Sequence, residues 1–155
     1  MRLPIQVEVI PFRYPDEADP QSMEVLALHR NPNKGGFWQP LTGGLESTDY
    51  NEQAAAYRET LEEIGVAQDG IARFVTLRHQ FAFTGNDGQL LTEKCFAIQL
   101  LPTTEIRLSA EHDGMQWGSP AEIRGLYLWD DNRFALDELV AIERARCLGG
   151  ASHGR

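Results

Sequence analysis

The octapeptide RETLEEIG occupies residues 58–65 and places Glu59, Glu62 and Glu63 within five positions of one another. On an α-helix these three positions share one side, as the i, i+3, i+4 spacing requires. Two carboxylates about 5 Å apart repel each other by roughly 3 kcal/mol at an effective dielectric constant near 20. The chain already carries a net charge of −9. The octapeptide therefore indicates either a solvated helix face or a site for a cation.

The residues around the octapeptide predict the helix that carries it. Residues 50–64 follow a helical apolar pattern. The expected buried stripe comprises Ala54, Tyr57, Leu61 and Ile64. Gly65 stands where such a helix ends. Ala55 and Ala56 lie on the acidic side, one turn before the glutamates, where small side chains let another backbone approach closely.

The longer segment GGLESTDYNEQAAAYRETLEEIGV, residues 43–66, resembles the Nudix hydrolase signature, G-x5-E-x7-R-E-U-x-E-E-x-G-U, in which U is bulky and apolar. The matching positions are Gly44, Arg58, Glu59, Glu62, Glu63, Gly65 and Val66. Two positions depart from the signature: Tyr50 stands where its first glutamate is expected, and Thr60 where its first U is expected. Glu46 or Glu52 is the candidate replacement for that glutamate, unless both are surface charges.

The resemblance implies roles for the residues of the signature. Glu59, Glu62 and Glu63 correspond to the family's main metal ligands, which implies Mg²⁺, or alternatively Mn²⁺, as the cofactor. Both are hard cations that favour carboxylate oxygens and water. In the family a carbonyl at the position of Gly43 often joins the metal ligands, and Arg58 corresponds to an arginine that orients a neighbouring carboxylate.

Glu111 is the candidate for a further acidic group outside the signature. Many Nudix enzymes carry an additional glutamate in this region, as a metal ligand or as a general base. A base must lie close to the attacking water, and a carboxylate beside a metal meets this condition. The alternative for Glu111 is an ordinary loop carboxylate, and His112 is expected to be structural or exposed.

Five residues are candidates for contacts with substrate. Arg30, Lys34 and Arg78 are candidates for binding phosphate groups, and Trp38 or Phe81 for stacking on a planar ring. The alternatives are solvated charges for the three cations and core positions for the two aromatic residues.

Three segments resemble one branch of the family, the dihydroneopterin triphosphate pyrophosphatases. They are FWQPLTGG at 37–44, the E-H-x4-W segment at 111–117, and a W-x-x-N-R-x-A-L segment at 129–136. The resemblance implies hydrolysis of dihydroneopterin triphosphate or of a (deoxy)nucleoside triphosphate, with release of pyrophosphate. A dinucleoside polyphosphate or another nucleoside-diphosphate-linked substrate is the alternative, and a non-catalytic nucleotide-binding Nudix domain is a third reading.

Strand and helix patterns alternate along the chain and predict one mixed α/β domain. Expected strands cover 3–12, 23–30, 71–83, 90–101 and 113–118, and expected helices cover 50–64, a capped segment after Ser119, and 132–147. With the resemblance, this order implies a Nudix-like α/β/α sandwich with a mixed, largely antiparallel central sheet. We expect a single domain over 1–148 and a flexible tail over 149–155.

Charge and composition limit the partners and the compartment. A net charge of −9 argues against nucleic acids and anionic membranes, which require clusters of basic residues. Cys95 and Cys147 lie far apart, no apolar run approaches 18 residues, and the N-terminus lacks a signal-peptide pattern. We expect a cytoplasmic monomer or homodimer whose partner is a small phosphoanhydride substrate.

Overall fold

The central strand β1 (Ile5–Arg13) faces two different cores. Val7 and Val9 point to one side of the sheet, and Ile10 and Phe12 point to the other. All four side chains are fully buried. The computed structural model describes residues 3–153 of the chain. Because β1 carries buried apolar side chains on both faces, the sheet needs a covering layer on each side.

The described residues form a seven-stranded sheet with the order β3-β2-β1-β6-β5, in which β4 also pairs with β1 and β7 also pairs with β2. Its strands after β1 are β2 (Glu24–Arg30), β3 (Trp38–Gln39), β4 (Leu41–Gly44), β5 (Ile71–Thr84), β6 (Leu90–Leu100) and β7 (His112–Gly118). The β1–β6 pair is parallel and the other pairs are antiparallel. This confirms the predicted mixed, largely antiparallel sheet.

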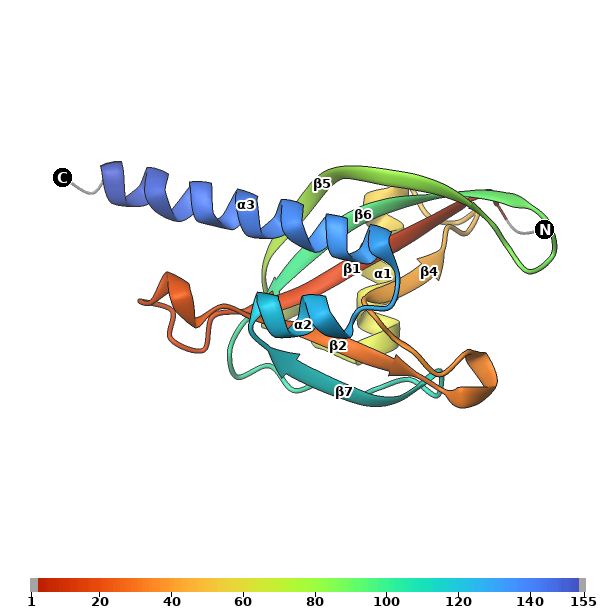
Figure 1. The fold of residues 1–155 in the computed structure, drawn as a ribbon, viewed down its shortest axis with the longest axis horizontal. Helices are drawn as coiled ribbons and strands as arrows, with labels where there is room; N and C mark the ends of the chain where they lie inside the picture. Colours follow the sequence, from red (N-terminus) through yellow and green to blue (C-terminus); the bar gives the residue numbers. More distant parts are fainter. Residues whose placement is uncertain (1–2, 154–155) are drawn as a thin grey trace.

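Helices cover both faces of the sheet (Figure 1). The first, α1 (Glu52–Ile64), packs on the core of Val7 and Val9, whereas α2 (Pro120–Leu126) and α3 (Asp130–His153) pack on the core of Ile10 and Phe12. The result is the predicted α/β/α sandwich. Within the described part of the chain, no helix is both long and apolar enough to span a membrane.

The ends of the helices follow local signals in the sequence. Asn51 caps the start of α1, and Gly65 ends it in the left-handed conformation with φ of 60°. Ser119 and Glu122 form the predicted capping box of α2. The last helix, however, continues to His153 instead of ending at residue 147. It therefore includes part of the expected tail, whose residues 154–155 lie outside the described region.

The buried side of α1 differs from the expected stripe. The residues of α1 that are buried include Ala55, Ala56 and Thr60, whereas Tyr57 and Leu61 are only half-buried. The helix is therefore rotated toward its small residues. This rotation lets the backbone of β4 approach α1 closely, and it carries Glu59 into the interior as well.

Candidate active site

Arg58 organises the acidic side of α1. Its Nε and Nη2 donate hydrogen bonds to the two carboxylate oxygens of Asp49, at 2.9 and 2.8 Å. Its Nη1 donates to Glu59 Oε1 at 2.9 Å and to Glu62 Oε2 at 3.2 Å. Nη2 also donates to the carbonyl oxygen of Gly44 at 3.0 Å. One guanidinium group thus serves three carboxylates and the loop that precedes the helix.

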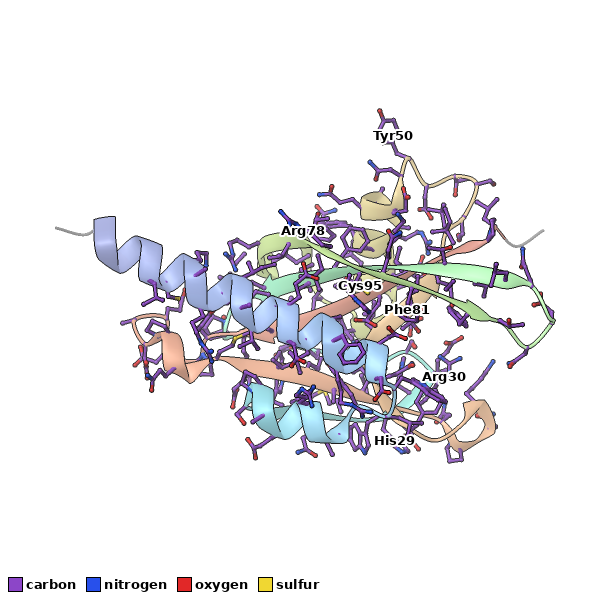
Figure 2. All side chains as sticks on the ribbon, turned by 45° about the horizontal axis from the view of Figure 1, so that its top comes forward. His29, Arg30, Tyr50, Arg78, Phe81 and Cys95 are labelled. Atoms are coloured by element: carbon purple, nitrogen blue, oxygen red, sulfur yellow. The ribbon has the colours of Figure 1, made fainter. Side chains whose placement is uncertain are left out.

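Asp49 lies one residue before the position of the missing signature glutamate and pairs with Arg58. Tyr50, at the expected position, is 94% exposed and points away from the molecule (Figure 2). The Asp49 side chain is only 6% exposed and pairs with Arg58 through both oxygens. Glu46 Oε1 lies 3.8 Å from Arg58, and no contact joins Glu52 to Arg58 among the described residues. Among these carboxylates, Asp49, one residue before the expected position, makes the shorter contacts with Arg58 and Glu46 makes a longer one. Sequence reasoning did not single out Asp49.

Burial and pairing shift the pKa values of this cluster in opposite directions. Hydrogen bonds from Arg58 lower the pKa of Asp49 below its usual range. Burial raises the pKa of Glu59 to about 7, although its hydrogen bond from Arg58 works in the other direction. Burial thus disfavours the ionised form of Glu59, because removing a carboxylate from water disfavours its charge.

The backbone of Gly43 lies directly against Glu59. A Cβ atom at position 43 would overlap the Glu59 carboxylate, whereas a Cβ at Gly44 would meet no atom within 4 Å. Position 43 therefore accepts only glycine while Glu59 keeps its place. The close approach brings main-chain atoms to a carboxylate, which is the kind of oxygen-rich setting that Mg²⁺ or Mn²⁺ favours.

The donor set around Arg58 suits a hard cation. Glu59 Oε1 and Glu62 Oε2 converge on one positively charged nitrogen, Arg58 Nη1. Within the described region, however, no three His, Cys, Asp or Glu side chains are arranged to hold an ion as they stand. A cation between Glu59 and Glu62 would therefore take over oxygens that now accept hydrogen bonds from Arg58.

Glu63 lies on the same helix but has different partners. Its Oε2 accepts a hydrogen bond from Ser109 Oγ at 2.6 Å and lies 3.4 Å from His112 Nδ1. Burial raises the pKa of Glu63, but the nearby His112 and the hydrogen bond from Ser109 outweigh it and lower the pKa overall. His112 is buried, which agrees with a structural position, and it also contacts a candidate metal ligand.

Glu111 lies beside this contact. It is exposed, and its backbone N–H donates to Ser109 Oγ at 3.3 Å. The structure therefore places Glu111 next to the residues that hold Glu63. Ser109 was missed because a serine in a loop carries no distinguishing signal in the sequence.

The three candidate phosphate-binding cations do not lie together. Arg30 Nε donates to the carbonyl oxygen of Lys34 at 3.1 Å, and the positive charge of Arg30 contributes to the lowered pKa of Glu63. Lys34 is exposed in the following turn. Arg78 is exposed on β5, and Figure 2 shows it well separated from Arg30. The charge of Arg30 thus acts on Glu63, whereas Arg78 lies apart from Arg30.

The two candidate stacking residues lie on the other face of the sheet from α1. Trp38 and Phe81 both pack against the core beneath α2 and α3. Trp38 makes an edge contact with His29, with ring centroids 4.9 Å apart, and Phe81 lies 5.8 Å from His79. Both are therefore parts of aromatic clusters as well as candidates for stacking.

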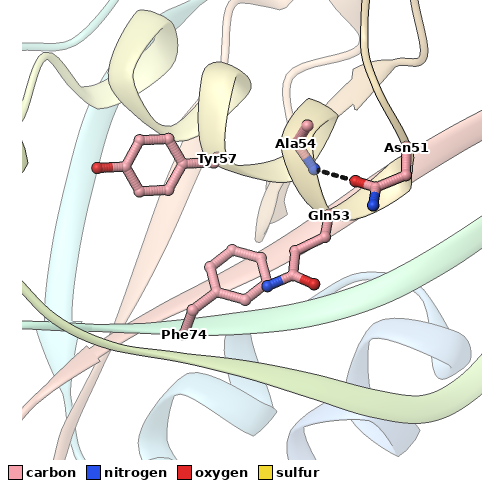
Figure 3. Close-up of a pocket in the computed structure, with 5 residues that line it drawn as sticks. All are labelled: Asn51, Gln53, Ala54, Tyr57 and Phe74. Atoms are coloured by element: carbon pink, nitrogen blue, oxygen red, sulfur yellow. Dashed lines mark hydrogen bonds between the residues drawn. The ribbon is translucent and has the colours of Figure 1, made fainter.

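A cavity of about 460 Å³ lies beside the first turns of α1 (Figure 3). It is lined by Asn51, Gln53, Ala54, Tyr57 and Phe74. In Figure 3, Asn51 Oδ1 accepts the hydrogen bond from the Ala54 N–H that caps the helix, at 2.8 Å. None of the expected metal or substrate residues lines this cavity.

Comparisons with solved structures support the fold. A Listeria monocytogenes protein classed as a Nudix hydrolase is 29% identical, with 93% of this chain and 97% of that chain covered and a TM-score of 0.77. The Caenorhabditis elegans Ap4A hydrolase, in a binary complex, is 18% identical with a TM-score of 0.75, covering 92% and 99%. The Escherichia coli dihydroneopterin triphosphate pyrophosphohydrolase is 22% identical with a TM-score of 0.70, covering 90% and 97%.

Comparisons of sequence identify the family. An octanoyltransferase from Myxococcus xanthus is 42% identical over 96 residues, which is 60% of this chain and only 26% of that protein. The chain thus matches about a quarter of that relative's length. The profile of the NUDIX domain matches residues 11–139, which include the acidic helix, Gly43 and Glu111. The chain therefore belongs to the Nudix family of hydrolases.

Proposed function

We propose that this protein catalyses Mg²⁺-dependent hydrolysis of a phosphoanhydride bond, releasing pyrophosphate from dihydroneopterin triphosphate or a (deoxy)nucleoside triphosphate. The observation that carries the proposal is the charge imbalance at α1. Asp49, Glu59 and Glu62 share one guanidinium group. A cluster with more carboxylates than cations gains stability when a divalent ion binds, and Mn²⁺ is the alternative ion.

The residues proposed to hold the metal are Glu59, Glu62 and Glu63, with the carbonyl of Gly43 and with Glu111 as a further candidate ligand. When bound, the metal neutralises phosphate oxygens and lowers the pKa of water. Arg58 and Asp49 are proposed to hold the acidic side chains of α1 in fixed positions. This support matters because a ligand carboxylate that is held in place loses less conformational freedom when it binds.

The proposed base is Glu111, with a signature glutamate as the alternative. Water attacks a phosphorus atom, one P–O bond forms, and the bond to the bridging oxygen breaks. The proton of the water passes to the carboxylate, and pyrophosphate leaves with the bridging oxygen. Glu111 suits this role because its side chain is exposed while its main chain is fixed beside Glu63 through Ser109. Arg30 and Lys34 are proposed to contact the substrate phosphates.

The substrate is proposed from likeness to known enzymes. The E. coli structure that resembles this chain is a dihydroneopterin triphosphate pyrophosphohydrolase. A second candidate is a dinucleoside polyphosphate, because the C. elegans Ap4A hydrolase has a TM-score of 0.75 against this chain. Both candidates share a planar ring joined to a chain of phosphates, for which Trp38 and Phe81 are the candidate stacking residues.

A panel of substrates tests the proposal. Dihydroneopterin triphosphate, nucleoside triphosphates, dinucleoside polyphosphates and nucleotide sugars are each incubated with Mg²⁺ or with EDTA, and products are resolved by chromatography. We expect pyrophosphate from the pterin or a nucleoside triphosphate, only with Mg²⁺. Cleavage of dinucleoside polyphosphates alone would transfer the assignment to the second candidate. Folded protein that turns over no substrate in Mg²⁺ would contradict both.

A further inference from the structure

The loop that follows β6 is anchored to the C-terminal end of α1. The Arg107 N–H donates to the carbonyl oxygen of Ile64 at 2.8 Å, and the Ser109 N–H donates to the carbonyl oxygen of Glu63 at 2.9 Å. On the other side, the Asn31 N–H donates to the carbonyl oxygen of Glu111 at 3.0 Å. Main-chain hydrogen bonds therefore fix residues 107–111 between the acidic helix and the turn after β2.

The hydroxyl group of Ser109 joins two candidate functional residues. It donates its one hydrogen to Glu63 Oε2 at 2.6 Å and accepts the backbone N–H of Glu111 at 3.3 Å. A hydroxyl group has one hydrogen and two lone pairs, so both bonds can exist together. The side chain of Glu63 and the main chain of Glu111 are thus tied to the same oxygen atom.

His112 approaches the same oxygen of Glu63. Its side chain is 1% exposed, and its Nδ1 lies 3.4 Å from Glu63 Oε2. Both ring nitrogens of His112 are buried without a hydrogen-bond partner of good geometry. A buried imidazole without partners is costly, and Glu63 Oε2, 3.4 Å from Nδ1, is an acceptor that a small shift of the ring would reach. Among the described residues, no hydrogen-bond donor reaches Glu63 Oε1.

We propose that Ser109 and His112 are positioning residues, which hold Oε2 of Glu63 so that Oε1 is presented to the cation and Glu111 stays beside it. The inference rests on the proposed function, since it concerns how Glu63 meets the metal. It assigns a task to two residues that lie outside the signature, on a loop that reaches the helix from another part of the chain.

Binding of Mn²⁺ tests the assignment without relying on turnover. Free Mn²⁺ is measured by electron paramagnetic resonance during titration of wild type, Ser109→Ala and Ser109→Thr. Loss of a group that orients a metal ligand commonly weakens affinity by about 10- to 100-fold. We therefore expect roughly 10-fold weaker binding for Ser109→Ala and recovery in Ser109→Thr, which keeps the hydroxyl group.

Thr104→Val is the matched control. Thr104 lies on the same loop, and its Oγ1 donates to the carbonyl oxygen of Gly70 at 2.9 Å, away from Glu63. This variant also loses a hydroxyl hydrogen bond of the loop, and Mn²⁺ affinity should stay at the wild-type value. His112→Gln is an independent variant that leaves Ser109 intact, and about 3-fold weaker binding is expected from the loss of the second contact. Circular dichroism verifies the fold of each variant.

The outcomes separate this inference from the proposed function. Wild-type affinity in both Ser109→Ala and His112→Gln would overturn the positioning role. An equal loss in Thr104→Val would overturn it too, because the effect would then come from the loop in general. Mn²⁺ binding that depends on Ser109, without turnover of any substrate, would overturn the proposed reaction alone. Wild-type protein that binds no Mn²⁺ would overturn both.

Discussion

Two helices of this protein each carry a buried glutamate, and the two glutamates differ in their hydrogen-bond partners. On α3, Glu143 Oε1 accepts from Tyr14 at 2.6 Å and from Arg146 at 3.1 Å, and its Oε2 accepts from Arg73 at 2.6 Å. On α1, Glu59 shares its one guanidinium group with two other carboxylates. Glu143 thus pairs with two arginines, Arg73 and Arg146. Glu59 pairs with one arginine, which also binds Asp49 and Glu62.

The difference in partners decides the charge state of each group. Burial disfavours ionisation of Glu143, but the hydrogen bonds from Arg73, Tyr14 and Arg146 outweigh it and lower its pKa. At Glu59, burial outweighs Arg58 and raises the pKa to about 7. In the cluster on α3, Arg73 and Arg146 compensate the charge of Glu143. This cluster also joins the helix to the sheet. The cluster on α1 lacks positive charge, which a bound cation would supply.

The largest expected effect comes from breaking the cluster on α3. Removing one member of a buried ion pair commonly costs 3–5 kcal/mol. Arg73 and Arg146 are partly exposed, so we expect Glu143→Ala to lower the free energy of unfolding by about 2–3 kcal/mol. Urea titration measures this value. Asp137→Ala, which removes the exposed pair with Arg124, should stay near wild type. Equal midpoints for the two variants would contradict the comparison.

The next effect tests whether Asp49 supports the acidic cluster. Asp49→Asn removes the charge that faces Arg58, and we expect hydrolysis to fall about 30-fold, within the range typical of groups that orient metal ligands. Tyr50→Glu restores the signature glutamate at an exposed position, so it should not rescue Asp49→Asn in the double variant. Rates are measured under saturating Mg²⁺ on the substrate found by the panel. Full rescue by Tyr50→Glu would show that Asp49 is not the replacement.

A pH series should give opposite slopes for the two glutamates. Glu59 has a pKa raised from 4.5 to about 7, so the folded state binds more protons than the unfolded state between these values. Its contribution to stability therefore falls as pH rises from 4.5 to 7, by at most about 1.4 kcal/mol per pH unit. Glu143 has a lowered pKa, so its contribution is complete above 4.5 and is lost as pH falls toward the folded value.

The measurement compares wild type with Glu59→Gln and with Glu143→Gln, by urea unfolding in EDTA from pH 3.5 to 7.5. The difference between wild type and Glu59→Gln should change between pH 4.5 and 7, and that between wild type and Glu143→Gln below pH 4.5. Slopes of the same sign would refute the contrast. Added Mn²⁺ should flatten the Glu59 slope only, because a bound cation favours the ionised carboxylate.

The smallest effect is expected at Arg78, which is exposed on β5 and whose backbone N–H donates to Glu138 on α3. Arg78→Ala should change KM by less than about 2-fold, as is usual for exposed positions away from special features. Arg30→Ala is the comparison, and a larger rise in KM is expected because Arg30 lies near Glu63. Steady-state kinetics on the same substrate measure both. A larger rise in KM for Arg78→Ala than for Arg30→Ala would favour Arg78 as the phosphate contact.

Local signals made the two ends of α1 and the cap of α2 predictable from the sequence. Asn51, Gly65 and the Ser119–Glu122 box act on neighbouring backbone groups, so a few residues of sequence contain the whole cause. The buried side of α1 was less predictable. A helical wheel identifies apolar residues, but the close approach of β4 through Gly43 selects the face with Ala55 and Ala56.

The residues of the candidate site also fall into those that the sequence predicts and those that it does not. The glutamates on α1 were predictable because their spacing along one helix is itself the signal. Asp49 was not, because the turn before α1, in which the Asp49 N–H donates to the carbonyl oxygen of Glu46, directs residue 49 and not residue 50 toward Arg58. Ser109 was not predictable either, since it meets Glu63 across 46 positions of sequence and local pattern contains no information about such a contact.

The separation of 46 positions between Glu63 and Ser109 also means that the two residues are synthesised at different times. At a synthesis rate of roughly 5–20 residues per second, about 2 to 9 s pass between the addition of Glu63 and that of Ser109. The acidic helix is therefore made well before the loop that holds it, and β6, the parallel partner of β1, also follows later. A nascent chain carries its glutamates for seconds before they are arranged, and the site is completed only as the last third of the chain is made.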